Sequence, residues 1–130
     1  MIAPRITALY AVMLATIFLV LSVRIAVARW RREQYFGEAD SSIAMLVRAH
    51  SNFVENIPIA LILLSFAEVR GAAWNVMHGL ASALVVSRVL HAYGVSKEPE
   101  PIWFRVCGYT LTCIIIGGAA VTILYQLTTR

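Results

Sequence analysis

Charged residues and cysteines are scarce in this sequence. Only 14% of its 130 residues are charged, with 7 Asp and Glu against 11 Lys and Arg, whereas 60% are hydrophobic. Together with a mean hydropathy of +0.76, this composition is too apolar for a soluble domain of the same length. The scarcity of charge therefore excludes an ordinary soluble protein and predicts an integral membrane protein.

The few cysteines and the modest charge exclude further classes. Cys107 and Cys113 fall in one predicted helix and point about 240° apart, which favours packing residues over a disulfide or a metal pair. No spacing of His, Cys and Glu suggests a metal site. The net charge is only +4, and the basic residues cluster near loops rather than along an aromatic-bearing groove. Nucleic acid is therefore not an expected partner.

Four apolar segments predict an all-α bundle of four membrane-spanning helices, which forms a single domain over residues 1–130. Ile6 to Val23 carries no charge over about 27 Å of helix, enough to count as a span. The spans that follow it argue against a cleaved signal peptide. The expected helices cover about residues 5–30, 42–68, 72–93 and 102–127.

Several residues should shape these helices locally. Asp40 or Ser41 is expected to cap the second helix, and Pro58 to kink it by removing one backbone hydrogen bond. Gly94 is expected to end the third helix. The pair Gly117-Gly118 should allow the fourth helix to approach a neighbour closely.

The loops differ in charge between the two ends of the bundle, which sets the expected orientation. Basic residues are in excess beside the first and third loops, which are therefore expected in the cytoplasm, with both termini outside. The residues counted are Arg29, Arg31, Arg32 and Lys97 on the loop side and Arg5, Arg70 and Arg130 on the opposite side.

The second predicted helix carries an unusual density of polar residues, LVRAHSNFVENIP, from Leu46 to Pro58. Its uncharged remainder, Asn56 to Ala67, is about 18 Å long, whereas a bilayer core is about 30 Å thick. Glu55 should therefore lie within the hydrocarbon, at a cost of roughly 2.5–3.5 kcal/mol, and such a residue marks a functional site by default.

Alternating topology should bring polar residues of all four helices to one depth. On a helix, Arg48, Asn52 and Glu55 share one face, and Arg105 and Tyr109 lie one turn apart. One interpretation is structural, with Glu55 paired to an arginine. One carboxylate cannot neutralise three arginines, however, and the surplus favours an anionic ligand with carboxylates or phosphates. The converging residues are Arg24, Arg29, Arg48, Asn52, Glu55, Arg88, His91, Arg105 and Tyr109.

Three motifs resemble one family, the membrane-associated proteins in eicosanoid and glutathione metabolism (MAPEG), and in particular its bacterial branch. They are RAHSNFVEN over residues 48–56, SRVLHAYG over residues 87–94 and the pair Arg105 and Tyr109. The four-helix pattern fits nearly the whole chain. The chain departs from eicosanoid-processing members at Ser51, Val95 and Val106, and Tyr93 is out of phase with their helix 3 tyrosine.

The resemblance implies a homotrimer that binds glutathione between neighbouring subunits near the cytoplasmic face. Arg105 and Tyr109 would lie near the thiol as catalytic residues. The implied ligand residues are Arg29, Arg48, Asn52, Glu55, Arg88, His91, Arg105 and Tyr109.

The favoured hypothesis is a transferase or peroxidase of the bacterial inner membrane that uses glutathione, or a similar anionic thiol, as co-substrate. Cations that stabilise a thiolate turn a thiol into a usable nucleophile at neutral pH. A lipophilic small molecule could reach that sulfur from the surrounding lipid. Two alternatives stay open: a non-catalytic membrane protein with an anion-binding or structural role, and a small multidrug transporter that uses Glu55.

Overall fold

The computed structural model describes residues 3–35, 37, 40–97 and 101–129, and these residues form four helices without a strand. The helices are α1 (Arg5–Arg31), α2 (Ser41–Val69), α3 (Trp74–Val95) and α4 (Ile102–Thr128). The prediction of an all-α four-helix bundle is thereby confirmed. The central residues of the two expected polar loops, 38–39 and 98–100, and the terminal Arg130 lie outside the described part.

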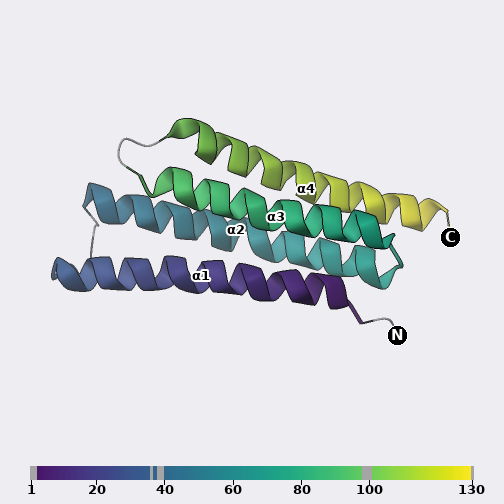
Figure 1. Ribbon diagram of the computed structural model, residues 1–130, viewed down its shortest axis with the longest axis horizontal. Coiled ribbons are helices and arrows are strands. Elements are labelled where there is room, and N and C mark those ends of the chain that lie inside the picture. Colours follow the sequence, from purple (N-terminus) through teal and green to yellow (C-terminus); the bar gives the residue numbers. More distant parts are fainter. Residues whose placement is uncertain (1–2, 36, 38–39, 98–100, 130) are drawn as a thin grey trace.

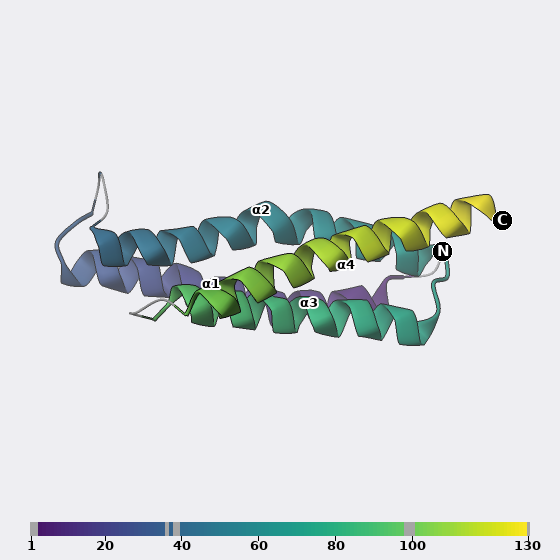
Figure 2. The same cartoon turned by 90° about the horizontal axis from the view of Figure 1, so that it is seen from above.

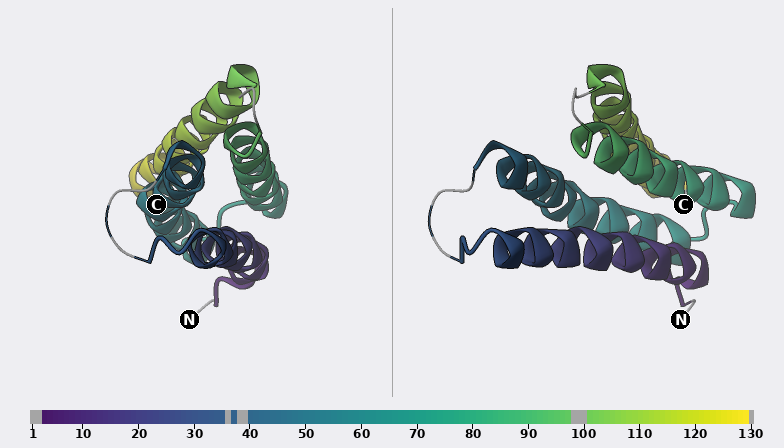
Figure 3. Two further views of the ribbon diagram at one scale, coloured as in Figure 1. Left: turned by 90° about the vertical axis from the view of Figure 1, so that its left-hand side faces the viewer. Right: turned by 60° about the vertical axis from the view of Figure 1, so that its left-hand side comes forward.

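The four helices lie along one long axis and alternate in direction, with α2 and α3 between α1 and α4 (Figure 1). Every pair of helices is in contact except α1 and α4, as far as the described residues show. Both chain termini and the α2–α3 turn lie at one end, here called the terminal end. The connections α1–α2 and α3–α4 lie at the other, here called the loop end (Figures 1 and 3). Polar residues near the two connections therefore share one end of the molecule.

Three of the helices, α1, α2 and α4, are long and apolar enough to cross a membrane by length and composition. Helix α3 is not among them, and it carries Ser87, Arg88 and His91. All three side chains are buried among the other helices rather than turned outward. Since α3 joins the end of α2 to the start of α4 at opposite ends of the bundle (Figure 1), it crosses the same thickness as they do.

The outer surface of the chain is largely apolar, as expected for a protein in lipid. Exposed side chains include Leu19, Phe66 and Ile114. Cys107 and Cys113 are free and also lie on this surface. Their interpretation as packing residues is therefore wrong within this chain, although the absence of a disulfide between them agrees with their expected directions.

Helices α3 and α4 touch through two glycines near the loop end. A Cβ atom on Gly108 would lie 2.7 Å from the backbone nitrogen of His91 and 2.7 Å from the carbonyl oxygen of Ser87. A Cβ atom on Gly94 would lie 2.7 Å from the backbone nitrogen of Arg105. These distances are shorter than van der Waals contact, so both positions require glycine.

Of two expectations about glycines, one is therefore wrong and the other is confirmed only in part. Gly94 does not end α3, which continues to Val95; it is a contact point with α4. Gly117 faces open space, whereas a Cβ atom on Gly118 would lie 3.3 Å from the side chain of Leu80, a close contact with α3 that does not reach its backbone. The physical reason is that α4 diverges from α3 toward its C-terminal end (Figure 2), so the close backbone approach occurs earlier in α4.

The path of α2 is bent near its middle in the same view, as expected for a helix that contains Pro58.

Gly108→Ala should destabilise the protein, whereas Gly117→Ala should not. The new methyl group at residue 108 would collide with the backbone of α3, at a cost of about 1–3 kcal/mol. At residue 117 the methyl group meets open space, and alanine favours a helix over glycine by up to about 1 kcal/mol. Thermal unfolding of the detergent-solubilised variants would measure the difference. Equal melting temperatures would contradict the close contact.

The terminal end is held by a carboxylate, Glu68, that no motif in the sequence singles out. Glu68, in the last turn of α2, accepts hydrogen bonds from the backbone N–H groups of Ile6 and Thr7, each at 2.7 Å. The Thr7 hydroxyl donates a third, also at 2.7 Å. The first turn of a helix has unpaired N–H donors and a partial positive charge. Glu68 therefore caps α1 from a neighbouring helix and fixes α1 against α2.

Glu68→Gln should destabilise the bundle, because an amide would turn its NH2 group toward donors that a carboxylate accepts. Hydrogen bonds to charged groups contribute roughly 1.5–3 kcal/mol, and we expect a loss of this order. The matched control is Glu33→Gln, the same change at an exposed position after the end of α1. Thermal unfolding in detergent is the measurement, and an unchanged melting temperature for Glu68→Gln would contradict the cap.

Candidate functional site

A cavity of about 360 Å³ opens between α2, α3 and α4 near the loop end. Five of the residues predicted to bind a ligand line it, and they come from all three helices. Its wall is completed by apolar side chains, among them Val95 and Val106. The lining residues are Met45, Arg48, Asn52, His91, Val95, Arg105, Val106 and Tyr109.

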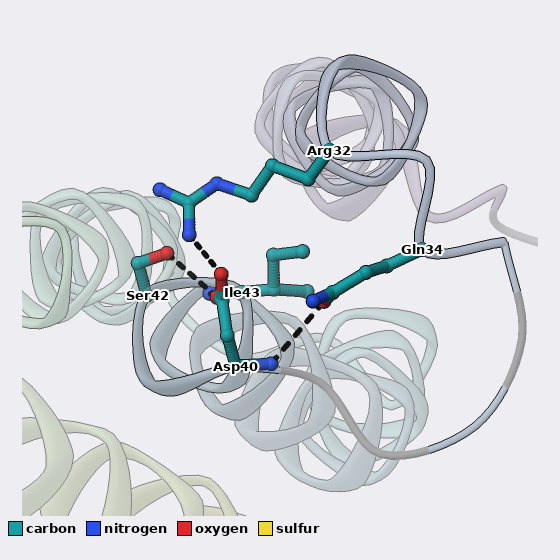
Figure 4. Close-up of polar contacts among 5 residues, drawn as sticks. All are labelled: Arg32, Gln34, Asp40, Ser42 and Ile43. Atoms are coloured by element: carbon teal, nitrogen blue, oxygen red, sulfur yellow. Dashed lines mark hydrogen bonds and ion pairs between the residues drawn. The ribbon is translucent and has the colours of Figure 1, made fainter.

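The register of α2 in this site is set where the helix begins (Figure 4). Asp40 is the N-cap, and its carboxylate accepts a hydrogen bond of 2.9 Å from the backbone N–H of Ile43. It also accepts one of 2.8 Å from the Ser42 hydroxyl and forms an ion pair with Arg32 at the end of α1. Of the two capping residues expected from the sequence, the structure selects Asp40. Arg48 and Asn52 follow two and three turns later.

The same contacts make this cap insensitive to pH under physiological conditions. The hydrogen bond from Ile43, with those from Ser42 and the nearby charge of Arg32, lowers the pKa of Asp40 to about 2. A carboxyl whose pKa is lowered by folding stabilises the fold above its unfolded pKa, and that contribution disappears as the pH falls through the folded value. The cap should therefore persist at neutral pH and fail only in strong acid.

Helices α3 and α4 bring His91 and Arg105 together. The His91 side chain forms a 3.2 Å hydrogen bond between its Nδ1 atom and the carbonyl oxygen of Arg105. This contact follows from the close approach at Gly94 and Gly108, since a longer distance between the helices would separate the two groups. The motif that contains His91 and the pair Arg105 and Tyr109 therefore meet in one site because the backbones of α3 and α4 lie close together.

Arg88 lies behind the cavity rather than in its wall. The side chain is only 1% exposed. Its Nη1 atom donates to Oδ1 of Asn52 at 2.7 Å, and its Nη2 atom donates to the carbonyl oxygen of Gly108 at 3.2 Å and to the hydroxyl of Thr112. The Ser87 hydroxyl completes the set, 3.4 Å from Nε. Arg88 therefore orients Asn52, which does line the cavity, and joins α2, α3 and α4.

Thr112 and Ser87 were missed by the reasoning from sequence. Their hydroxyls lie 3.0 Å apart, both side chains are fully buried, and both contact Arg88. A hydroxyl residue in an apolar helix is common and carries no signal by itself. A usable signal would have been the spacing of Thr112 one turn beyond Gly108, on the face of α4 that meets α3.

Two other predicted residues are not brought into the cavity by this chain. Glu55 is exposed on α2, and no salt bridge joins it to Arg48 or Arg88 in the described part of the chain. Arg29 belongs to α1 and donates a 3.1 Å hydrogen bond to the carbonyl oxygen of Gln34. The structure thus gathers five of the eight predicted ligand residues, holds one of them, Asn52, through Arg88, and leaves Glu55 and Arg29 outside.

Arg88→Lys should destabilise the protein although it keeps the charge. An ammonium group cannot reach acceptors on α2 and α4 simultaneously as the planar guanidinium does. The lost hydrogen bonds should cost roughly 2–3 kcal/mol, measured by thermal unfolding. Arg48→Lys, the same change at an exposed position of α2, is the control. A melting temperature of Arg88→Lys equal to that of the control would show that the network does not stabilise the bundle.

The fold and the site together define a helical membrane protein with a cationic pocket inside its bundle. The family model for the MAPEG family matches residues 7–125. The chain therefore belongs to the MAPEG family, as its motifs indicated. It is also similar to "Inner membrane protein YecN" of Escherichia coli strain K12, with 33% identity over 90 residues, which cover 68% of this chain and 69% of that protein. The protein of the same name from strain CFT073 matches equally well.

Proposed function

We propose that this protein is a membrane-embedded transferase or peroxidase that uses glutathione, or a similar anionic thiol, against lipophilic electrophiles. The observation that carries the proposal is the composition of the cavity. Two guanidinium groups, from Arg48 and Arg105, line it together with Asn52, His91 and Tyr109, and no carboxylate is among its described lining residues. Such a site favours an anion that offers carboxylates to the arginines.

The chemistry follows from what these groups do to a sulfur atom. A thiol with a pKa near 8.5 becomes a nucleophile at neutral pH when a cation stabilises its thiolate. In this proposal Arg105 supplies the cation and Tyr109 a hydrogen-bond donor. Tyr109 and Val106 are 46% and 45% exposed on the surface of the chain. An apolar electrophile can therefore approach the sulfur from lipid, along a wall that Val95 and Val106 keep apolar.

We further propose that the site is completed in a homotrimer, with its ligand between neighbouring subunits. Glu55 supports this step, because it is an exposed carboxylate in the middle of a spanning helix, where a lone charge is costly. A neighbouring copy that covers α2 would shield it and bring it toward the amino group of a bound thiol. The placement that we propose is the inner membrane, with both termini outside and the site facing the cytoplasm.

Calorimetry with the purified, detergent-solubilised protein tests the first step. Glutathione should bind saturably, and both Glu55→Gln and Arg105→Ala should weaken binding by about ten- to a hundredfold, the loss of one charge-assisted contact. Glu33→Gln, an exposed carboxylate outside the site, serves as the matched control. Tyr109→Phe should retain binding but slow turnover of a lipophilic aryl halide.

The outcomes separate binding from catalysis. No binding at millimolar glutathione would contradict the assignment of the thiol. Binding without turnover of any aryl halide or hydroperoxide would contradict the enzymatic part and leave an anion-binding membrane protein.

A further inference from the structure

A second groove lies between α1 and α3 and shares no lining residue with the site cavity. Its volume is about 430 Å³, within the range of ligand-binding clefts. Ile17, Val20 and Leu21 form its α1 wall, and Val89 and Ala92 belong to its α3 wall. The groove is therefore a separate feature, and the inference drawn from it goes beyond the proposed function.

The groove changes from apolar to cationic along its length. Helices α1 and α3 run in the same direction (Figure 1), so rising residue numbers in both walls lead toward the loop end. The α1 wall from Thr16 to Arg24 spans about 12 Å. Arg24 and Lys97 stand together at its loop end. The groove is thus apolar along most of its length and carries two positive charges at its loop end.

Among the described residues, one contact holds each of the two cations in place. Arg24 donates one hydrogen bond of 2.9 Å, from Nη1 to the Ser96 hydroxyl. The Lys97 ammonium lies 4.8 Å from the centre of the Tyr93 ring. A guanidinium carries five N–H donors and an ammonium three. Within the described lining of the groove there is no carboxylate to neutralise them.

We propose that this groove binds an anionic phospholipid. One acyl chain lies along the apolar walls, and the phosphate group contacts Arg24 and Lys97. Basic pockets between spanning helices at the cytoplasmic side are suited to anionic headgroups. Tyr93, 45% exposed, adds an aromatic side chain of the kind enriched at the membrane interface. A soluble anion would contact the cations but leave the apolar walls unused.

Native mass spectrometry of the delipidated, detergent-purified full chain tests the proposal. The probes are phosphatidylglycerol and phosphatidylcholine with identical acyl chains, and glycerol 3-phosphate as the free headgroup anion. We expect saturable binding of one phosphatidylglycerol per chain, weaker binding of phosphatidylcholine, and no competition by glycerol 3-phosphate at equal concentration.

Variants separate the charges from the walls. Arg24→Gln and Lys97→Gln should each weaken phosphatidylglycerol binding about fivefold, and the double variant about 30-fold, since a basic residue near the surface contributes about 1 kcal/mol. Arg24→Lys should bind nearly as the unchanged protein does. Arg5→Gln, at the far end of α1, is the matched control and should have no effect. Ala92→Leu keeps both cations but fills the apolar wall, and should also weaken binding.

Three results would overturn the proposal. Equal affinity for both phospholipids would show that the cations do not select the headgroup. Effective competition by glycerol 3-phosphate would assign the cations to a soluble anion. An oligomer that retains no anionic lipid at saturating phosphatidylglycerol would show that a second copy of the chain covers the groove.

Discussion

A buried guanidinium group is the constraint on which the rest of this structure depends. Arg88 lies inside a membrane bundle, where an unsatisfied charge is costly, and no carboxylate among the described residues pairs with it. Its charge is instead distributed over neutral acceptors on α2, α3 and α4. Because these acceptors belong to different helices, the spacing of the bundle near the loop end is set by the reach of one side chain. The glycine at residue 108 is part of the same constraint, since it lets α4 come close enough to offer its carbonyl oxygen.

This arrangement also divides the arginines by role. The Arg88 guanidinium forms its hydrogen bonds inside the protein, where it holds Asn52 in a defined orientation beside the cavity. Arg48 and Arg105 remain at the cavity wall, where a ligand can reach them. A site that must recognise an anion in a low-dielectric environment benefits from such support, because a preoriented wall needs little rearrangement when the ligand binds. Arg88 thus has a structural role in the polar cluster, whereas Arg48 and Arg105 stay in the wall of the cavity to which the proposed function assigns the ligand. The expected pairing of Glu55 with Arg48 or Arg88 does not form among the described residues.

Much of this could be predicted from the sequence, because hydrophobic segments and charge spacing follow from local periodicity. The four helices and their faces are of this kind, and so is the convergence of Arg48, Asn52, His91 and Arg105 at one end. What could not be predicted depends on distances between helices. Gly94 looks like a helix stop in the sequence, yet in three dimensions it is a contact with Arg105. Likewise, Arg88 and Arg48 look alike in the sequence, and only packing buries the first and exposes the second.

The two ends of the bundle differ in a way that bears on function. At the terminal end the Glu68 carboxylate accepts hydrogen bonds from the first backbone N–H groups of α1 and so holds α1 to α2. At the loop end the Asp40 carboxylate has a comparable role at the start of α2, whereas Arg48 and Arg105 line the site cavity and Arg24 and Lys97 line the groove between α1 and α3. A carboxylate that caps a helix contributes to stability, whereas cations beside open cavities create an electrostatic field that attracts anions. The terminal end is thus held together by a carboxylate that caps α1, whereas the cations at the loop end border the two cavities that we propose to bind anions.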